Sequence, residues 1–253
     1  MLLTTRGLVL REAKYQESDK ILTVLTESEG KLTVRVRWAA RPSSRYAAAV
    51  QLLCFSELTL FGNKGRWSLN EAEALEQFLG LREDVGRFAL GAYIAELLEW
   101  VSDEDSPGRE PLRLGLNCLY ALSRGLRETG HIKAVFELRL ACVSGYKPRL
   151  DSCAICGSPE PPEPVLNLEE GTICCASCVE FGARTASVRL CAASLAAMRY
   201  IASAPPRREL GFSLEPEAAR RLGLATERYL TARLEREPRT LDFYRKLGIE
   251  VGF

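Results

Sequence analysis

Residues 1–70 consist of short apolar or alternating segments separated by turn residues. Four such segments predict strands, and a fifth follows them, at 7–12, 20–26, 31–38, 52–61 and 66–71. Turn residues occupy the connections, with Ser28 and Gly30 in a tight hairpin and Gly62 and Gly65 in a later turn. The pattern therefore predicts a small barrel or sandwich of five short strands.

After Glu71 the apolar residues recur with a helical period. Pro111 suits the first turn of a helix, and Gly130 and Gly145 suit helix ends. The predicted helices lie at 82–101, 111–128, 132–144, 191–204, 215–234 and 240–247. A segment rich in Cys, Pro and Gly, 146–186, interrupts this pattern, so we expect a helical body with an inserted non-helical segment.

The composition is that of a globular protein, because 253 residues with 47% hydrophobic side chains can bury a substantial core. The best candidate for a membrane span, 88–101, is interrupted by Glu96 and Glu99, and no stretch reaches the roughly 18 uncharged apolar residues that a span needs. The N-terminal residues lack the apolar core and cleavage site of a signal peptide. We therefore expect a cytoplasmic protein with no membrane partner.

Charge is spread unevenly along the chain, although the net charge is only +1. Residues 1–70 hold eleven Lys and Arg against six Asp and Glu, a net charge of +5, which leaves −4 for the rest. In the predicted strand 31–38, apolar side chains alternate with Lys31, Thr33, Arg35 and Arg37, three of which are cations. This face favours an anionic ligand, but an ordinary solvated strand face has the same pattern.

Five of the nine cysteines lie in the short stretch from Cys153 to Cys178. This clustering and the odd count favour a metal site over a disulfide framework. Two C-x-x-C turns, Cys153 with Cys156 and Cys175 with Cys178, are joined by residues 157–174, and each can present two sulfurs to one tetrahedral zinc ion. We therefore predict these four as ligands of one zinc. Four thiolates leave no open position for water, which indicates a structural site.

Cys174 leaves an alternative for the second turn, because three residues separate it from Cys178 and zinc also tolerates that spacing. The C-x-x-C register is commoner, which favours Cys175. The other four cysteines lie in apolar segments, where a thiol behaves as a small buried hydrophobe: Cys54, Cys118, Cys142 and Cys191.

Several motifs occur in a characteristic order along the chain. Residues 15–19, Tyr-Gln-Glu-Ser-Asp, precede the apolar strand 21–26 and Gly30-Lys-Leu. Residues 136–140, Phe-Glu-Leu-Arg-Leu, precede 145–150, Gly-Tyr-Lys-Pro-Arg-Leu, which leads into the first C-x-x-C turn. In these motifs the chain resembles the RecO family of bacterial recombination mediators, and weaker matches extend the resemblance over nearly the whole sequence.

The resemblance implies an α+β multidomain protein with an N-terminal OB-fold β-barrel at 1–79, followed by an all-α domain at 80–150 and 187–253 into which a four-cysteine zinc finger at 151–186 is inserted. It also implies a function. RecO-like proteins bind single- and double-stranded DNA, anneal complementary strands, contact the C-terminal tail of single-stranded-DNA-binding protein, and act with RecR to load RecA. Such a protein works in the cytoplasm with the nucleoid.

On an OB-fold barrel, nucleic acid commonly contacts a strand face and the loops beside it. The expected phosphate contacts are therefore Lys31, Arg35, Arg37, Arg41 and Arg45. Trp38 and Trp67 are candidate stacking platforms for unpaired bases, but aromatic residues at strand ends more often belong to the core. In the helical body, Arg139, Lys147 and Arg149 are a candidate seat for the acidic tail peptide.

No catalytic constellation accompanies these features. The sequence contains no Walker-type phosphate loop, so we expect no nucleotide cofactor. The single histidine, His131, lies at a predicted helix start, where capping or solvent exposure is the expected role. We therefore expect no enzyme activity. The alternatives are a zinc-ribbon adaptor that contacts only proteins, and a metal-dependent nuclease.

Overall fold

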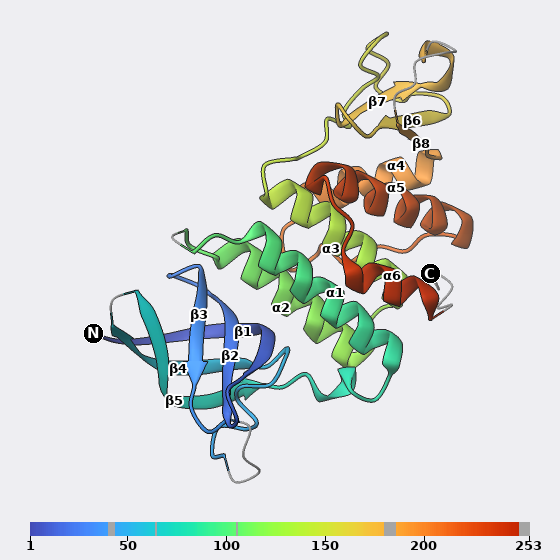
Figure 1. Ribbon diagram of the computed structural model, residues 1–253. Coiled ribbons are helices and arrows are strands. Elements are labelled where there is room, and N and C mark those ends of the chain that lie inside the picture. Colours follow the sequence, from blue (N-terminus) through green and yellow to red (C-terminus); the bar gives the residue numbers. More distant parts are fainter. Residues whose placement is uncertain (40–43, 64, 105, 180–185, 248–253) are drawn as a thin grey trace. The chain divides into compact units, whose positions relative to one another are not determined.

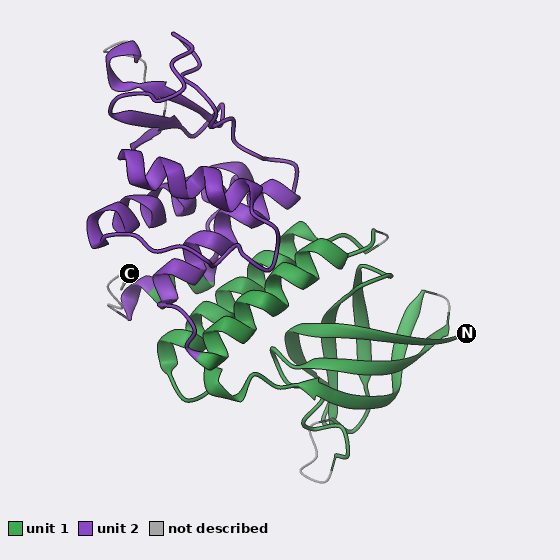
Figure 2. Cartoon of the chain, turned by 180° about the vertical axis from the view of Figure 1, so that it is seen from behind, with its two compact units in different colours: residues 1–124, 240–244 green, residues 125–239, 245–253 purple. Residues whose placement is uncertain are grey.

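The computed structural model (Figure 1) describes residues 1–39, 44–63, 65–104, 106–179 and 186–247. Its contacts divide the chain into two compact units, residues 1–124 with 240–244, and residues 125–239 with those from 245 onward (Figure 2). The finer division into four parts stays a prediction.

The N-terminal strands close into a barrel (Figure 1). Their bounds are β1 (Leu2–Tyr15), β2 (Asp19–Thr26), β3 (Lys31–Val36), β4 (Phe55–Asn63) and β5 (Arg66–Glu76). The order around the barrel is β1-β2-β3-β5-β4; β3 and β5 pair in parallel, and the other neighbours pair antiparallel. This confirms the predicted five-stranded, OB-like barrel.

Strand β5 is longer than predicted. It runs to Glu76 because it pairs with β4 in antiparallel register, with Phe55 opposite Glu76. Glu and Ala alternate over residues 71–74, a pattern that also suits a half-buried strand. The prediction of a helical period directly after Glu71 was therefore wrong, and helical structure begins at η1 (Leu79–Leu81).

Alternating side chains fill the barrel interior. In β3, Leu32, Val34 and Val36 are buried, while Thr33 is exposed on the outer face. The three buried side chains pack with apolar residues of the other strands, among them Val9, Leu22, Val24, Leu58 and Leu60. Burying one such side chain contributes about 1.5–3 kcal/mol, so the apolar periodicity fixes which face of β3 points outward.

Gly30 fixes the turn between β2 and β3. Its φ of +66° is left-handed, and a Cβ there would lie 2.4 Å from the carbonyl oxygens of both Asp103 and Ser106. The N–H of Lys31 donates to the carbonyl oxygen of Asp103 at 2.9 Å. Only glycine allows this close approach of the two backbones. The turn that opens the basic strand is thus held against the loop around Asp103.

The first unit also contains the helices α1 (Val85–Val101) and α2 (Arg109–Arg124). Asp84 caps α1, since its side chain accepts the N–H of Arg87 at 2.8 Å. The sequence predicted that α2 would continue to residue 128, but it ends at Arg124. The left-handed Gly125, with φ +61°, follows directly and stops the helix there.

The remaining helices are α3 (Thr129–Val143), α4 (Ala192–Ser203), α5 (Pro216–Leu234) and α6 (Arg239–Lys246). Helix α3 packs against α4 and α5 and is buried over most of its length. Its buried Lys133 forms ion pairs with Glu137 at 2.7 Å and with Glu227 at 2.6 Å, so a charge inside the second unit is compensated. Within the described part of the chain, no helix combines the length and apolar character needed to cross a membrane.

His131 lies in the first turn of α3 and is only 8% exposed. Its ring centroid lies 4.3 Å from that of Phe212. Burial, and then the charge of Arg127, lower the pKa of His131 to about 4. The expectation of a cap or of solvent exposure was therefore wrong, because a segment distant in sequence covers the ring.

The cysteine-rich segment forms a three-stranded sheet in the order β7-β6-β8. Its elements are β6 (Pro164–Asn167), β7 (Thr172–Cys175), the short helix η2 (Ala176–Cys178) and β8 (Ser187–Arg189). Strand β8, which follows the predicted segment 151–186, also belongs to this sheet. The second cysteine turn begins at the end of β7, and the N–H of Ala154 in the first turn donates to the carbonyl oxygen of Ile173 in β7 at 2.8 Å.

Candidate metal centre and nucleic-acid face

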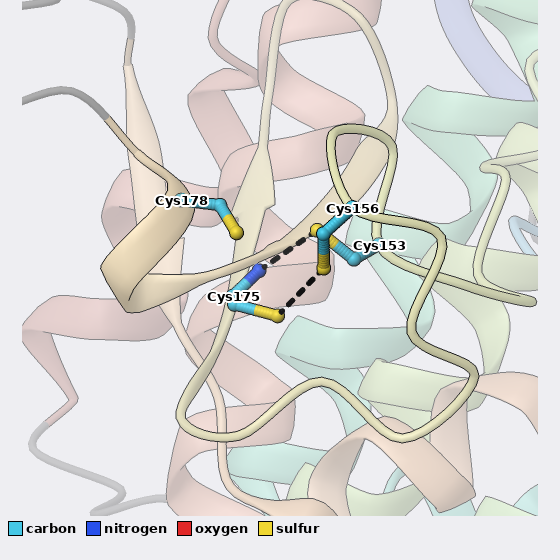
Figure 3. Close-up of side chains that lie close together, drawn as sticks. All are labelled: Cys153, Cys156, Cys175 and Cys178. Carbon is cyan, nitrogen blue, oxygen red and sulfur yellow. Dashed lines mark hydrogen bonds between the residues drawn. The ribbon is translucent and has the colours of Figure 1, made fainter.

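The first cysteine turn follows α3 and is shaped by Gly157. The N–H of Gly157 donates to the carbonyl oxygen of Cys153 at 2.9 Å, and its φ of +76° is left-handed. The N–H of Cys153 donates to the carbonyl oxygen of Ser158 at 2.8 Å. This tight turn directs the sulfurs of Cys153 and Cys156 to the same side (Figure 3).

The second turn adds Cys175 at the end of β7 and Cys178 in η2. The four sulfur atoms of Cys153, Cys156, Cys175 and Cys178 all lie within 4.8 Å of one another (Figure 3). The Sγ atoms of Cys156 and Cys175 are 3.7 Å apart, and the N–H of Cys175 donates to Sγ of Cys153 at 3.3 Å. The structure thus brings together the four cysteines that the sequence singled out.

This arrangement fits a zinc ion in size and in donor chemistry. Zinc–sulfur bonds of about 2.3 Å at tetrahedral angles place neighbouring sulfurs about 3.8 Å apart. The set consists of thiols alone, which are the soft ligands that zinc accepts in closed structural sites. If zinc binds here, these four side chains would hold it and the ion would tie the two turns together.

The electrostatics of the cluster also favour a cation. Burial opposes the thiolate of Cys153, but backbone N–H groups of Cys156, Cys175 and Ile155 outweigh it and lower its pKa to about 6. Burial and the sulfurs of Cys153 and Cys156 raise the pKa of Cys175 to about 12. Without a metal, therefore, one thiolate discourages ionisation of the next, and a divalent cation would remove that conflict.

Cys174 lies beside the four sulfurs but is not one of the group that meets. It precedes Cys175 in β7, and successive side chains of a strand point to opposite faces. Its thiol is buried, and burial raises its pKa. Of the two registers that the sequence left open, the structure brings Cys175 and Cys178 into the cluster.

The predicted DNA-contact residues of the barrel differ in their surroundings. Lys31 is half-buried, and its Nζ donates to the carbonyl oxygen of Glu99 at 2.8 Å. The Arg35 guanidinium is paired with Asp19, with Nη2 2.7 Å from Oδ2. Arg37 is exposed and, among the described residues, makes no ion pair.

Arg45 is exposed but lies among carboxylates. Its guanidinium carbon lies 4.6 Å from the ring centroid of Tyr46. Together they line a shallow hollow of about 320 Å³ with Glu57, Glu71 and Glu73. The fifth predicted contact, Arg41, lies outside the described residues. Arg37 is thus the described contact candidate whose charge is most available.

The three cations predicted to bind an acidic peptide differ in their burial. Arg139 is half-buried, and its Nε lies 3.4 Å from a carboxylate oxygen of Glu209, while Lys147 and Arg149 are exposed. Of the three cations, therefore, Lys147 and Arg149 are the exposed ones, and Arg139 is engaged by Glu209.

A basic cavity in the second unit was not anticipated from the sequence. It has a volume of about 510 Å³ and lies between β8 and α5. Its lining includes Leu224 and the arginines Arg189, Arg220, Arg221 and Arg228. Glu217 pairs with Arg220 at 2.9 Å and with Arg221 at 2.8 Å, whereas Arg189 and Arg228 have no ion pair within the described chain. These arginines come from two separate segments, so no sequence motif marks the cavity.

The chain matches known families over almost all of its length. Residues 1–78 match the family described as Recombination protein O N terminal, and residues 82–242 match Recombination protein O C terminal. The chain belongs to the RecO family. This confirms the resemblance found in the sequence motifs. The motif of residues 15–19 forms the turn from β1 into β2. The motif of residues 145–150 leads into the first cysteine turn, which ends at Gly157.

Curated RecO proteins align along nearly the full chain. The DNA repair protein RecO of Acetivibrio thermocellus is 31% identical over 245 residues, which is 97% of each chain. The DNA repair protein RecO of Desulforudis audaxviator is 34% identical over 249 residues, again 97% of each. That of Symbiobacterium thermophilum is 32% identical over 244 residues and 94% of each.

Proposed function

We propose that this RecO-family protein is a recombination mediator that binds single- and double-stranded DNA and anneals complementary strands. With RecR, it would help load RecA onto DNA coated by single-stranded-DNA-binding protein. The observation that supports this most directly is the five-stranded barrel that carries Lys31 and Arg35 on β3 and the exposed Arg37 directly after it. We further propose that it acts in the cytoplasm, on the nucleoid.

Annealing on such a surface is an electrostatic process. Cations beside the sugar-phosphate backbone neutralise phosphates and release counterions. Two strands held in this way repel each other less, so complementary bases can pair. Nothing in this process requires nucleotide hydrolysis or cleavage of a covalent bond.

Within the proposed contact set, the structure supports unequal roles. Arg37 is exposed just after β3, whereas the ammonium of Lys31 donates to the backbone carbonyl oxygen of Glu99 and the guanidinium of Arg35 pairs with the carboxylate of Asp19. The Arg35 side chain is 36% exposed despite its pairing with Asp19, and Lys31 is half-buried, so both cations stay partly accessible to a polyanion. We propose Arg37 as the main phosphate contact, with Lys31, Arg35, Arg41 and Arg45 as secondary ones.

Replacing Arg37 by alanine tests this assignment. Arg37→Ala should weaken binding to single-stranded oligonucleotides of any sequence. It should also reduce the slope of log affinity against log salt by about 0.7, the contribution of one phosphate contact. The measurement is a binding titration at several salt concentrations.

Arg45→Ala is the matched control, because Arg45 is an exposed arginine of the same barrel that lies among carboxylates. Its effect on affinity and salt slope should be smaller. An Arg37→Ala protein with an unchanged slope, or one matched by Arg45→Ala, would show that Arg37 is not the main phosphate contact.

We propose one structural zinc ion per chain, held by Cys153, Cys156, Cys175 and Cys178. The support is the size and donor set of the sulfur cluster. The segment between the two turns is rich in proline and poor in apolar residues, so a metal would supply the stability that a small core cannot. The zinc would hold the three-stranded sheet and takes no part in chemistry.

We also propose that the second unit binds the acidic C-terminal tail of single-stranded-DNA-binding protein. Two surfaces are candidates, the exposed Lys147 and Arg149, and the cavity that contains Arg189 and Arg228 beside the apolar Leu224. The cavity offers both charge and an apolar contact, which suits an acidic peptide with a hydrophobic end.

A pair of double variants separates the two candidate surfaces. Arg189→Ala/Arg228→Ala should weaken binding of the tail peptide at least ten-fold, whereas Lys147→Ala/Arg149→Ala should change it little. The reverse order of effects would assign the tail to the Lys147 surface. A protein that binds the peptide but neither binds nor anneals DNA would be an adaptor instead.

A further inference from the structure

Two aromatic side chains are exposed at one end of the barrel. Tyr15, the last residue of β1, is 42% exposed, and Trp38, two residues after β3, is 54% exposed. Tryptophan is highly buried on average, because exposing its ring to water is unfavourable. Both rings are exposed near the cations of β3, which points to an anionic ligand that can also stack on aromatic rings.

The backbone around these rings is held in an unfavourable conformation. Trp38 has a φ of 59°, in the left-handed region that bulky residues avoid. Gln16, which follows Tyr15, has a φ of 56°. Such conformations persist only where neighbouring groups impose them, and they gather at binding and catalytic sites.

One ion pair, between Asp19 and Arg35, contacts both segments. Asp19 is 7% exposed, and its carboxylate accepts the N–H of Trp38 at 3.0 Å and Nε–H of Arg35 at 2.9 Å. The hydrogen bond from Trp38, and then the one from Arg35, lower the pKa of Asp19, so the carboxylate stays ionised. Nη2 of Arg35 also donates to Oε1 of Gln16 at 3.0 Å, and its guanidinium carbon lies 5.3 Å from the ring centroid of Tyr15. Asp19 and Arg35 thus fix the segments of both aromatic residues.

We propose that Trp38 and Tyr15 form a stacking site for the unpaired bases of single-stranded nucleic acid, and that Asp19 and Arg35 are its positioning residues. The inference rests on the proposed DNA binding by the barrel and deepens it. Aromatic rings stack on any base, but the bases of a duplex already stack on each other and are not available. The site therefore gives the barrel a preference for single strands, which phosphate contacts alone do not.

An oligonucleotide without bases separates stacking from phosphate contact. The full-length protein is titrated with a 20-nucleotide oligothymidylate and with an abasic oligomer of the same length and charge. Wild-type protein should bind the oligothymidylate roughly five-fold or more tightly, which is the lower end of what stacking of one base contributes. Trp38→Ala should abolish most of this ratio and leave binding to the abasic oligomer unchanged.

Tyr120→Ala is the matched control. Tyr120 is a 46% exposed aromatic residue on α2 with the guanidinium of Arg124 5.5 Å from its ring centroid, so it reproduces the chemistry of Tyr15 with Arg35 elsewhere in the same unit. Its replacement should leave the ratio at the wild-type value. A ratio near one in the wild-type protein, or one that Trp38→Ala does not lower, overturns the stacking site. Absence of binding to both oligomers would instead overturn the proposed DNA binding itself.

Trp38→Gly tests whether the ring is kept for binding rather than for folding. Glycine tolerates the left-handed backbone, so the melting temperature should be equal to or higher than that of the wild type. The preference for bases over the abasic oligomer should nevertheless be lost. A Trp38→Gly protein with a lower melting temperature and an undiminished preference would make Trp38 a structural residue and overturn the inference.

Asp19→Asn tests the positioning role. The amide keeps an oxygen that can accept the N–H of Trp38 but removes the charge that holds Arg35. The base preference should fall by an intermediate amount, with a smaller change in binding to the abasic oligomer. Equal losses on both oligomers would mean that Asp19 acts only through the overall fold of the barrel.

Discussion

At the scale of single residues, His131 shows how burial sets a charge state. Its ring packs on Phe212, and burial, followed by the charge of Arg127, lowers its pKa from 6.5 to about 4. Between these two values the unfolded chain binds a proton that the folded protein does not. The unfolded state is therefore stabilised as the pH falls through this interval, and the folded protein loses stability.

Lowering the pH from 7 to 5 should reduce the free energy of unfolding by about 2 kcal/mol through His131 alone. His131→Gln removes the titrating group, so its loss over the same interval should be smaller by that amount. Urea unfolding at the two pH values measures both. Since His131 is the only histidine of the chain, a common pH dependence in the two proteins would contradict its burial as a neutral ring.

Residue environments could be predicted from the sequence where local periodicity decides them. The burial of Leu32, Val34 and Val36 follows from the alternation of a strand. The pairing of Arg35 with Asp19 could not be predicted, because the two residues meet only once β2 and β3 pair. The burial of His131 was missed for the same reason, because Phe212, which packs on its ring, is distant in the sequence.

At the scale of elements, boundaries were predicted well where capping residues mark them. Helix α5 was expected at 215–234 and spans Pro216–Leu234, with proline in its first turn. The end of β5 was missed because alternating Glu and Ala satisfy both a strand and the start of a helix, and pairing with β4 decides between them. The ends of an element can therefore be predicted from local sequence where capping or turn residues mark them, but not where pairing with a neighbouring strand extends the element.

The cysteine turns are the element-scale feature that the sequence described best. Their spacing selected four residues, and the structure brings those four sulfurs within 4.8 Å of one another. The spacing left open whether Cys174 or Cys175 belongs to the group. Strand β7 decides this, because alternation gives the two neighbours opposite directions.

Two serine substitutions test the proposed zinc site. Cys178→Ser should lower the zinc content from one ion per chain to near zero and expose the segment from 151 to 189 to protease, because zinc binding supplies about 10 kcal/mol or more of folding free energy to such a segment. Cys174→Ser, which alters a buried thiol next to the cluster, should retain its zinc. Elemental analysis of the purified proteins measures both, and zinc loss from Cys174→Ser with retention in Cys178→Ser would refute the assignment.

At the scale of the whole molecule, the net charge of +5 over residues 1–70 does not show which cations of the barrel are free. Four of these cations are paired with carboxylates, three of which are already subtracted in that count. These pairs are Arg6 with Glu57, Arg11 with Glu99, Lys20 with Glu12, and Arg35 with Asp19. Counting charged residues in the sequence cannot predict these pairs, because all four join residues of different elements. Arg37, just after β3, is exposed and has no ion pair among the described residues, and this is where we place the main DNA contact.

Strand annealing tests the central claim, DNA binding by the barrel without covalent chemistry, most directly. Complementary labelled oligonucleotides, coated with single-stranded-DNA-binding protein, are mixed with equimolar zinc-loaded protein in the absence of nucleotide. We predict that duplex forms faster than without the protein, that the strands keep their length, and that Arg37→Ala slows the reaction. If the zinc-loaded protein neither accelerates annealing nor binds the oligonucleotides in low-salt buffer, the proposed function is wrong.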